Sequence, residues 1–332
     1  MDSMALHHKT KAGVSVKVLY IVGVGRSGST LLERMLGAIP AAVNAGELNA
    51  IFSRVASQDQ RCGCGEPFSV CPFWTAVGNE AFGGWASVTA RMSHLQPRLI
   101  RQRHVPRMLT GIASSAYRCE LDEYVDVHRR LYESIAKVSG AELVVDASKS
   151  TAQLFALRRI PGVDLRVLNL VRDSRGVANS WNKSGIAKPQ SGDGALMGTY
   201  SPHRLAVLWA FIQLECAMLR AAAPHSARIR YEDLVAGPRP TLDRALRQVG
   251  LPPATGALNH IGERSVHLSP SHGVAGSRTR FTDGNIKLEL DDAWRSSLPA
   301  SARRLVTALT LPLLLGYGYL RRQPAALRTL TP

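Results

Sequence analysis

The sequence has few acidic and few aromatic residues. Its 332 residues include 25 Asp and Glu against 41 Lys and Arg, which gives a formal net charge of +16. Such a balance favours a polyanionic or phosphate-rich partner, such as an acidic lipid, a nucleotide or a sulfated product. Aromatic residues make up only 6% of the chain, and none lies in the basic stretch 91–107. Because single-stranded nucleic acid is held by aromatic side chains interleaved with basic ones, we do not expect a nucleic-acid partner.

The sequence also lacks a long hydrophobic run. Its most apolar stretch, 305–320, is shorter than the roughly 20 residues of a membrane span, and Pro312 interrupts it. We expect a buried C-terminal helix there, with no stable membrane span. Flanking arginines leave peripheral contact with an anionic membrane open; they are Arg303, Arg304, Arg321 and Arg322. Residues 1–15 have no apolar core, so we expect a disordered lead-in, no signal peptide and a cytoplasmic protein.

Cysteine is scarce and unevenly placed. Three of the five cysteines, Cys62, Cys64 and Cys71, lie in "RCGCGEPFSVC". Zinc sites use four ligands, usually with C-x-x-C pairs, but here one residue separates the first pair and no histidine is near in the sequence. The spacing therefore does not predict a metal site, and a disulfide would require an oxidising compartment. We interpret the stretch as a compact, Gly- and Pro-rich surface insertion.

Strand-like and helix-like stretches alternate along most of the chain. The strands are expected at 17–24, near 41–47, and at 141–146, 163–173 and 227–233. The helices are expected at 29–39, 120–138, from Ser150, and at 174–183, 203–222 and 239–250. We predict a single α/β domain spanning 1–332, with a P-loop-like central parallel sheet covered by helices on both faces.

Residues 52–135 interrupt this alternation. The first part, 52–107, is expected to be irregular, and the arginines of 91–107 are typical of a solvated helix face. Within the amphipathic helix 120–138, His128 lies on the apolar side, so we interpret it as a core or boundary residue.

A glycine-rich loop, "GVGRSGST", follows the first strand. Its glycines and its final Thr30 are in register with a phosphate-binding loop, but Ser29 stands where a nucleoside triphosphatase carries lysine. Backbone N–H groups at a helix N-terminus still favour an anion there, and Arg26 places a guanidinium inside the loop. We expect a phosphate-like group to bind there without magnesium. The residues expected to hold it are Arg26, Ser27, Gly28, Ser29 and Thr30.

Two motifs together resemble a known family. "GVGRSGSTLL" (23–32) resembles the 5′-phosphosulfate loop of sulfotransferases that use PAPS, 3′-phosphoadenosine 5′-phosphosulfate. "LNLVRDSRGVANSW" (168–181) resembles their 3′-phosphate segment, with Arg172 ending a strand and Ser180 eight residues later. The alternative for Arg172 is a pair with Asp173 or a helix cap. The resemblance, over 17–50 and 140–295, implies a bacterial PAPS-dependent sulfotransferase similar to the tyrosylprotein and carbohydrate branch.

A third stretch also resembles a segment of the sulfotransferases that use PAPS. "HGVAGSRTRFTDG" (272–284) resembles a late loop that folds over the 3′-phosphate in bacterial members, and this implies a donor contact for Arg280. Ser277 and Arg278 replace the Asn-Pro of that pattern. Together the motifs imply that the donor is PAPS, that the product is PAP, and that no metal is required.

The resemblance also implies catalytic residues. Glu47 follows Arg26 by 21 residues in a Gly-Glu context, where tyrosylprotein sulfotransferases place a catalytic glutamate. Lys149, just past a strand, would stabilise the transition state together with Arg26. Alternatives for Glu47 are a salt bridge with Arg26 or a helix start, and the alternative for Lys149 is a solvated surface cation. Asp146 resembles the end of a Walker B strand, but without a loop lysine we expect it to orient Lys149 or a loop backbone. Three histidines are weaker candidates for the base: His203, His267 and His272.

The expected reaction is sulfuryl transfer by in-line attack of an acceptor hydroxyl or amine, with a carboxylate base. The acceptor is expected to be a small molecule, a glycan or a peptide, and 52–135 is expected to form its side of the site or a lid. Two alternatives stay open: a P-loop kinase or NTPase, and a non-catalytic protein that binds PAP or another nucleotide.

Overall fold

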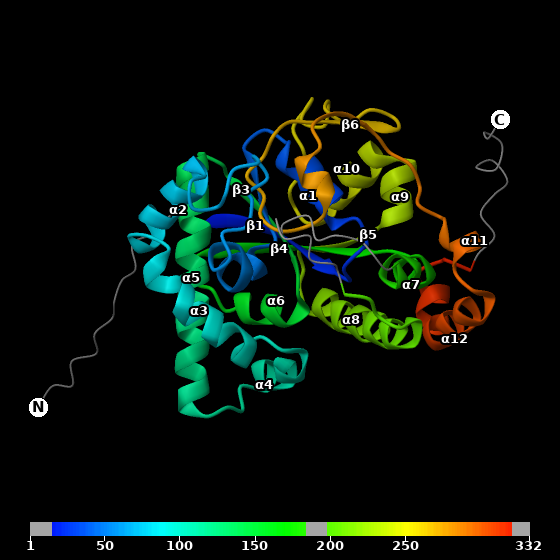
Figure 1. Ribbon diagram of the computed structural model, residues 1–332, viewed down its shortest axis with the longest axis horizontal. Helices are drawn as coiled ribbons and strands as arrows, with labels where there is room; N and C mark the ends of the chain where they lie inside the picture. The colour runs from blue at the N-terminus through cyan, green and yellow to red at the C-terminus, as the bar shows by residue number, and fades with distance from the viewer. Residues whose placement is uncertain (1–14, 184–197, 321–332) are drawn as a thin grey trace, which may run out of the picture.

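The core of the protein is a five-stranded parallel β-sheet. The computed structural model describes residues 15–183 and 198–320 (Figure 1). Within these residues the strand order is β2-β3-β1-β4-β5. The strands are β1 (Val16–Gly23), β2 (Ala42–Gly46), β3 (Leu143–Lys149), β4 (Val163–Val171) and β5 (Ser226–Arg230). Because β1 pairs in parallel with both β3 and β4, the carboxyl ends of these strands share one edge. This arrangement confirms the predicted α/β, P-loop-like fold.

Alternate side chains of β1 face two separate apolar cores. Val18, Tyr20 and Val22 pack into one core, and Leu19 and Ile21 pack into the other. All five are fully buried, as expected for a strand whose successive side chains point to opposite faces of a covered sheet.

Helices cover both faces of the sheet. Figure 1 shows α6 and α8 on one side and α1, α9 and α10 on the other. Their bounds are α1 (Ser29–Gly37), α6 (Thr151–Leu157), α8 (Pro202–Ala222), α9 (Tyr231–Ala236) and α10 (Pro238–Gln248). Beyond these lie α7 (Ser174–Asn182), the hairpin β6 (Ser265–Leu268) and β7 (Gly284–Lys287), η4 (Arg278–Phe281), α11 (Trp294–Ser297) and α12 (Ala300–Gly316).

The segment between β2 and β3 is largely helical, so the prediction of irregular chain at 52–107 was wrong outside 57–71 and the short connections between helices. The segment contains η1 (Leu48–Ala50), the π-helical η2 (Ile51–Ala56), α2 (Pro72–Phe82), α3 (Ala86–Leu99), η3 (Gln102–His104), α4 (Val105–Thr110) and α5 (Ser115–Ser139). Gly83 ends α2 in a left-handed conformation, and Pro97 lies inside α3. These breaks obscure the helical periodicity, but tertiary packing stabilises the helices, because Trp74, Leu95 and Leu131 are fully buried in one core.

The arginines of 91–107 belong largely to exposed helix surface, as predicted. Arg91 pairs with Glu123, and Arg98 pairs with Glu120, across α3 and α5. Both arginine side chains are about half exposed, so these pairs contribute little to stability.

Two predictions in the C-terminal half need correction. Strand β5 ends at Arg230, and the next residues form α9, because Glu232 and Asp233 in its first turn favour a helix N-terminus. Helix α12 is buried along one side only: Val306 is buried while Leu309 is 44% exposed. Across residues 15–183 and 198–320, every helix is too short or too polar to cross a bilayer. Apart from Ser15, the predicted lead-in lies outside the described residues, as do Arg321 and Arg322.

Candidate active site

The glycine-rich loop has the geometry of an anion-binding turn. It leaves β1 at Gly23 and enters α1 at Ser29, and Gly28 caps the helix with a φ of 91°. A Cβ on Gly28 would lie 2.7 Å from the ring of Tyr231, so glycine is needed for both conformation and space. Arg26 also has a positive φ, 70°, which is uncommon for a non-glycine residue. Strained backbone of this kind gathers at functional sites.

The hydroxyl groups of the loop are held in the interior. Ser27 is 1% exposed, and Ser29 and Thr30 are each 6% exposed. The Ser27 Oγ has no hydrogen-bond partner among the described residues. A buried hydroxyl beside a helix N-terminus can donate a hydrogen bond to an anion. The partial positive charge of the helix end attracts the same anion.

The predicted 3′-phosphate segment contacts this loop directly. The Arg172 guanidinium donates to the carbonyl of Arg26 at 3.0 Å, and the Trp181 indole donates to the carbonyl of Gly25 at 3.1 Å. The Arg26 guanidinium lies over the Trp181 ring, 5.5 Å from its centroid. Ser180 is half-buried in the last turn of α7, next to Trp181. The two motifs, distant in sequence, therefore meet at the carboxyl edge of β1 and β4.

Arg172 is paired, but with an acidic residue that the sequence did not indicate. Its guanidinium donates to the carbonyl of Asp291 at 2.7 Å and to the Asp291 carboxylate at 2.8 Å. Burial alone would raise the pKa of Asp291, but the hydrogen bond and the charge of Arg172 lower it overall. Asp173, the alternative partner considered above, caps α7 and pairs with Arg175 instead.

Glu47 and Lys149 come together from the ends of β2 and β3. The Lys149 ammonium and the Glu47 carboxylate form an ion pair, and their side chains are 17% and 13% exposed. Lys149 is therefore not a solvated surface cation. Its φ of 64° is left-handed, and the β1–β3 register shifts between Tyr20 and Val22, opposite the end of β3. This irregularity turns the Lys149 side chain off the strand towards Glu47.

Asp146 orders the backbone around this pair. It accepts hydrogen bonds from the Ser148 backbone N–H at 2.8 Å and from the Tyr132 hydroxyl at 2.6 Å. The Ser148 hydroxyl accepts in turn from the N–H of Asn49 at 2.8 Å, two residues after Glu47. Burial raises the pKa of Asp146 to about 6, although these hydrogen bonds act in the opposite direction. Asp146 thus has the loop-orienting role that the sequence suggested.

The late loop closes the site from the other side. Val274 pairs with the end of β2, and its carbonyl accepts from the N–H of Glu47 at 2.8 Å. Three residues later, the Ser277 N–H donates to the Thr30 hydroxyl at 3.0 Å. A Cβ added to the intervening Gly276 would lie 2.9 Å from the Thr30 Oγ1 and 3.6 Å from a Glu47 oxygen. The late loop therefore links the glycine-rich loop to Glu47, the candidate base.

Arg280 occupies the interior of the late loop. Its side chain is fully buried, and its guanidinium donates to the carbonyls of Ala275 and Arg61. The structure thus gives Arg280 partners within the protein, and its contact with the donor stays a prediction. The histidines His203 and His267 are exposed on α8 and β6.

Glu33 is a site residue that the sequence analysis missed. It lies one turn after Thr30 on α1 and is 1% exposed, and neither carboxylate oxygen has a hydrogen-bond partner among the described residues. Burial, and then the nearby charge of Glu47, raise the pKa of Glu33 well above its ordinary value. The available signal was a glutamate between the apolar Leu32 and Met35, one turn after Thr30.

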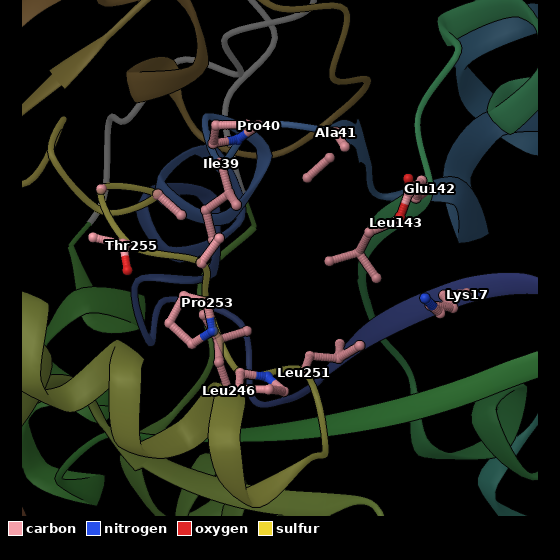
Figure 2. Close-up of a pocket in the computed structure, with 15 residues that line it drawn as sticks. Lys17, Ile39, Pro40, Ala41, Glu142, Leu143, Leu246, Leu251, Pro253 and Thr255 are labelled. Carbon is pink, nitrogen blue, oxygen red and sulfur yellow. The ribbon is translucent and has the colours of Figure 1, made fainter.

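An open cavity lies at the opposite edge of the sheet. Its volume is about 590 Å³, and it is bordered by the amino ends of β1, β2 and β3, at Lys17, Ala42 and Leu143. Figure 2 shows a mainly apolar lining, with Lys17 and Glu142 at one side. Ligands of open parallel sheets bind outside the carboxyl ends of the strands, so this cavity is separate from the candidate site.

Comparison with known proteins identifies the family. Residues 19–255 match the model of the sulfotransferase family. A search of curated proteins found no significant match. Among solved structures, the sulfotransferase domain of the Synechococcus PCC 7002 olefin synthase is 17% identical, with a TM-score of 0.47 over 90% of this chain and 94% of that one. The sulfotransferase domain of the curacin biosynthetic pathway is 16% identical, with a TM-score of 0.49 over 90% and 97%. The Mycobacterium tuberculosis sulfotransferase STF1 is 16% identical, with a TM-score of 0.40 over 74% and 72%.

The family match does not separate branches, so the similarity to the tyrosylprotein and carbohydrate branch stays a prediction. The match includes the glycine-rich loop, Glu47, Lys149 and the Arg172 segment, and it covers more than two thirds of the chain. This protein belongs to the sulfotransferase family.

Proposed function

We propose that the protein transfers a sulfuryl group from PAPS to an acceptor hydroxyl or amine and releases PAP. The contact between the two motif segments carries this proposal: Arg172 donates to the backbone of Arg26 inside the phosphate-binding turn. A single donor with phosphate groups at both its 5′ and 3′ positions needs two anion sites at one sheet edge. The two candidate anion sites of this protein, the glycine-rich loop and the Arg172 segment, meet at one such edge.

The donor's sulfated end would occupy the loop. Backbone N–H groups of the loop and the hydroxyls of Ser27, Ser29 and Thr30 would bind the 5′-phosphosulfate oxygens. Arg172 and Ser180 would bind the 3′-phosphate, since a guanidinium fork matches two oxygens of one anion. The Asp291 carboxylate, which now pairs with Arg172, would have to release it.

Glu47 would act as the base and Lys149 as the electrostatic stabiliser. The acceptor oxygen would form a bond to sulfur while the bond from sulfur to the bridging phosphate oxygen breaks, and Glu47 would take the acceptor proton. Negative charge would build on the bridging oxygen, where Lys149 and Arg26 would stabilise it. The ion pair between Glu47 and Lys149 supports these roles, because it places a base and a cation side by side.

Residues 52–135 would provide the acceptor side of the site, and the acceptor would be a small molecule, a glycan or a peptide. A P-loop kinase or NTPase would need a cation at position 29, where this chain has serine. A non-catalytic PAP-binding protein would not require the paired Glu47 and Lys149.

Ligand-dependent thermal stability tests the donor. The full chain is heated with PAP, with ATP, and with each in the presence of magnesium. We expect PAP to raise Tm without magnesium and ATP to have a much smaller effect, since binding to the folded state stabilises it by mass action. A larger, magnesium-dependent shift with ATP would contradict the proposal in favour of a kinase or NTPase.

A further inference from the structure

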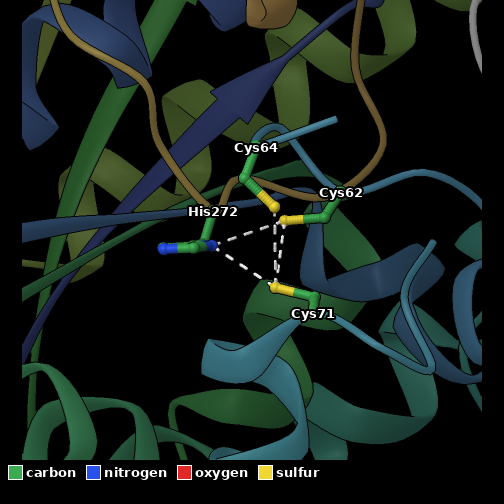
Figure 3. A group of neighbouring side chains, drawn as sticks. All are labelled: Cys62, Cys64, Cys71 and His272. Carbon is green, nitrogen blue, oxygen red and sulfur yellow. Dashed lines mark hydrogen bonds between the residues drawn. The ribbon is translucent and has the colours of Figure 1, made fainter. Parts of the chain in front are cut away.

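Three cysteines and one histidine converge beside the site just described. Cys62, Cys64 and Cys71 come from the insertion before α2, and His272 comes from the late loop. Their potential ligand atoms all lie within 4.8 Å of one another (Figure 3). Figure 3 shows the three sulfur atoms and the His272 ring nitrogen pointing into a common centre. We infer that this cluster is a structural zinc site with a Cys₃His ligand set.

The distances between ligand atoms fit a tetrahedral zinc ion. With Zn–S bonds of about 2.3 Å and a Zn–N bond of about 2.0 Å, tetrahedral geometry separates sulfur atoms by about 3.8 Å, and sulfur from nitrogen by about 3.5 Å. The Cys71 sulfur lies 3.6 Å from that of Cys62 and 3.7 Å from that of Cys64. The His272 Nδ1 lies 3.4 Å from the Cys71 sulfur and 3.7 Å from the Cys62 sulfur.

The same distances do not match a disulfide, whose sulfur atoms are bonded at about 2.05 Å. All three cysteines are free thiols in the structure. Cys62 and Cys71 are fully buried, whereas Cys64 and His272 are partly exposed. Four protein ligands that leave no open coordination position, none of them a carboxylate, are typical of structural zinc, because thiolate and imidazole are the donors that zinc prefers.

The surrounding contacts hold His272 in place. Its ring stacks on Phe73 with centroids 4.9 Å apart and planes inclined by 15°, and its carbonyl accepts from the Trp74 indole at 2.7 Å. The Gly63 N–H donates to the Gly273 carbonyl at 3.0 Å, and a Cβ on Gly63 would lie 2.6 Å from the Ser271 carbonyl. The glycine between the first two cysteines therefore lets their turn press against the histidine loop. Fixed ligand orientation of this kind is characteristic of metal sites.

A buried arginine lies near the negative charge that zinc binding would create at the cluster. Binding one Zn²⁺ would release a proton from each of the three thiols and leave a net charge of −1 on the cluster. The buried Arg280 guanidinium donates to the carbonyl of Arg61, the residue before Cys62, at 2.8 Å. A buried cation next to a thiolate ligand stabilises the charge that zinc binding creates there.

The proposed zinc would connect the insertion to the candidate active site. Five residues after His272, the Ser277 N–H bonds the Thr30 hydroxyl, and between them the Val274 carbonyl accepts from the Glu47 N–H. Zinc would therefore hold the late loop against the phosphate-binding turn and Glu47. The site has no open position for a substrate, so this is a structural role and not a catalytic one.

Metal analysis of the purified full chain tests the inference. The protein is expressed in zinc-containing medium, purified without chelators, and measured by inductively coupled plasma mass spectrometry. We expect about one zinc ion per chain in the wild type and less than a tenth of that in Cys64→Ser. The matched control is Cys119→Ser, an exposed cysteine on α5, which should keep its zinc.

Two further measurements use the wild type alone, so they do not require any variant to fold. Cobalt(II) exchanged into the wild type should give the thiolate charge-transfer and d–d absorption of a tetrahedral site. After removal of zinc by a chelator, hydrogen exchange should accelerate in 271–277 more than in β1. A wild type without bound metal would overturn the inference, as would a disulfide between any two of the three cysteines, found by mass spectrometry under non-reducing conditions.

Discussion

Lys149 and Glu47 form an ion pair at the carboxyl ends of β3 and β2, with side chains 17% and 13% exposed. Two features of the backbone produce this pair: the left-handed φ of Lys149 and the contact of the Glu47 N–H with Val274. Because the pair is only partly accessible to solvent, its charges are screened less than those of the surface pairs on α3 and α5.

Glu47→Gln should separate donor binding from turnover. The amide keeps the shape of the side chain but cannot take the acceptor proton, so we expect turnover to fall by roughly 10²- to 10⁴-fold. PAP affinity should stay within about twofold of the wild type. The measurement is transfer of labelled sulfur from PAPS to a panel of phenolic and glycosidic acceptors, beside PAP calorimetry. The exposed Glu263→Gln is the control, and unchanged turnover would remove Glu47 from the role of base.

Arg172→Ala should weaken PAP binding. The loss of a charged hydrogen-bond donor costs about 1.5–3 kcal/mol, so we expect the Kd for PAP to rise by roughly 10- to 150-fold. Calorimetry measures the affinity, and unfolding without ligand shows whether the variant is folded. Arg244→Ala, at an exposed position on α10, should bind PAP as the wild type does. Equal affinities for the two variants would exclude Arg172 from the donor site.

Asp291→Asn should have the opposite effect on PAP affinity. The Asp291 carboxylate competes with the donor for the Arg172 guanidinium, and its removal should lower the Kd for PAP by about three- to tenfold, within the ordinary range for one hydrogen bond. Asp292→Asn is the matched control, because that neighbour pairs with Arg295 instead. Weaker PAP binding by Asp291→Asn would show that Asp291 positions Arg172 and does not compete for it.

His128 should make stability depend on pH below neutrality. Its ring is fully buried in α5, as predicted, and its Nδ1 lies 2.9 Å from the carbonyl of Tyr124. Burial lowers the pKa of His128 to about 4, despite that hydrogen bond. The folded state therefore favours the neutral ring: the contribution to stability is complete above about pH 6.5 and is lost as pH falls through 4.

The matching variant is His128→Gln, which does not titrate in this range. The difference in free energy of unfolding between the wild type and this variant should shrink by about 3 kcal/mol between pH 7 and pH 4. Urea unfolding at several pH values measures it, and the exposed His203→Gln should show no such change. Parallel curves for the wild type and His128→Gln would contradict a buried neutral ring.

Local patterns were sufficient to predict the sheet and the anion-binding turn. Apolar runs around Val18 and Val144 specify strands covered on both faces, and the spacing of Gly23, Gly28 and Thr30 specifies a turn into a helix. Both depend on residues close in sequence, so local chemistry determines them. The end of β5 was misjudged, because helix-start acidic residues follow the strand without a break.

The sequence by itself determined the fold class, the phosphate-like turn and the residue types of the candidate site. Only the tertiary structure decided which of them meet: Arg172 with Asp291, Glu47 with Lys149, and the three cysteines with His272, about 200 residues later in the chain. The physical reason is that hydrogen bonds, ion pairs and metal ligands act over a few ångströms, and only the packing of loops at the sheet edge brings residues so distant in sequence that close.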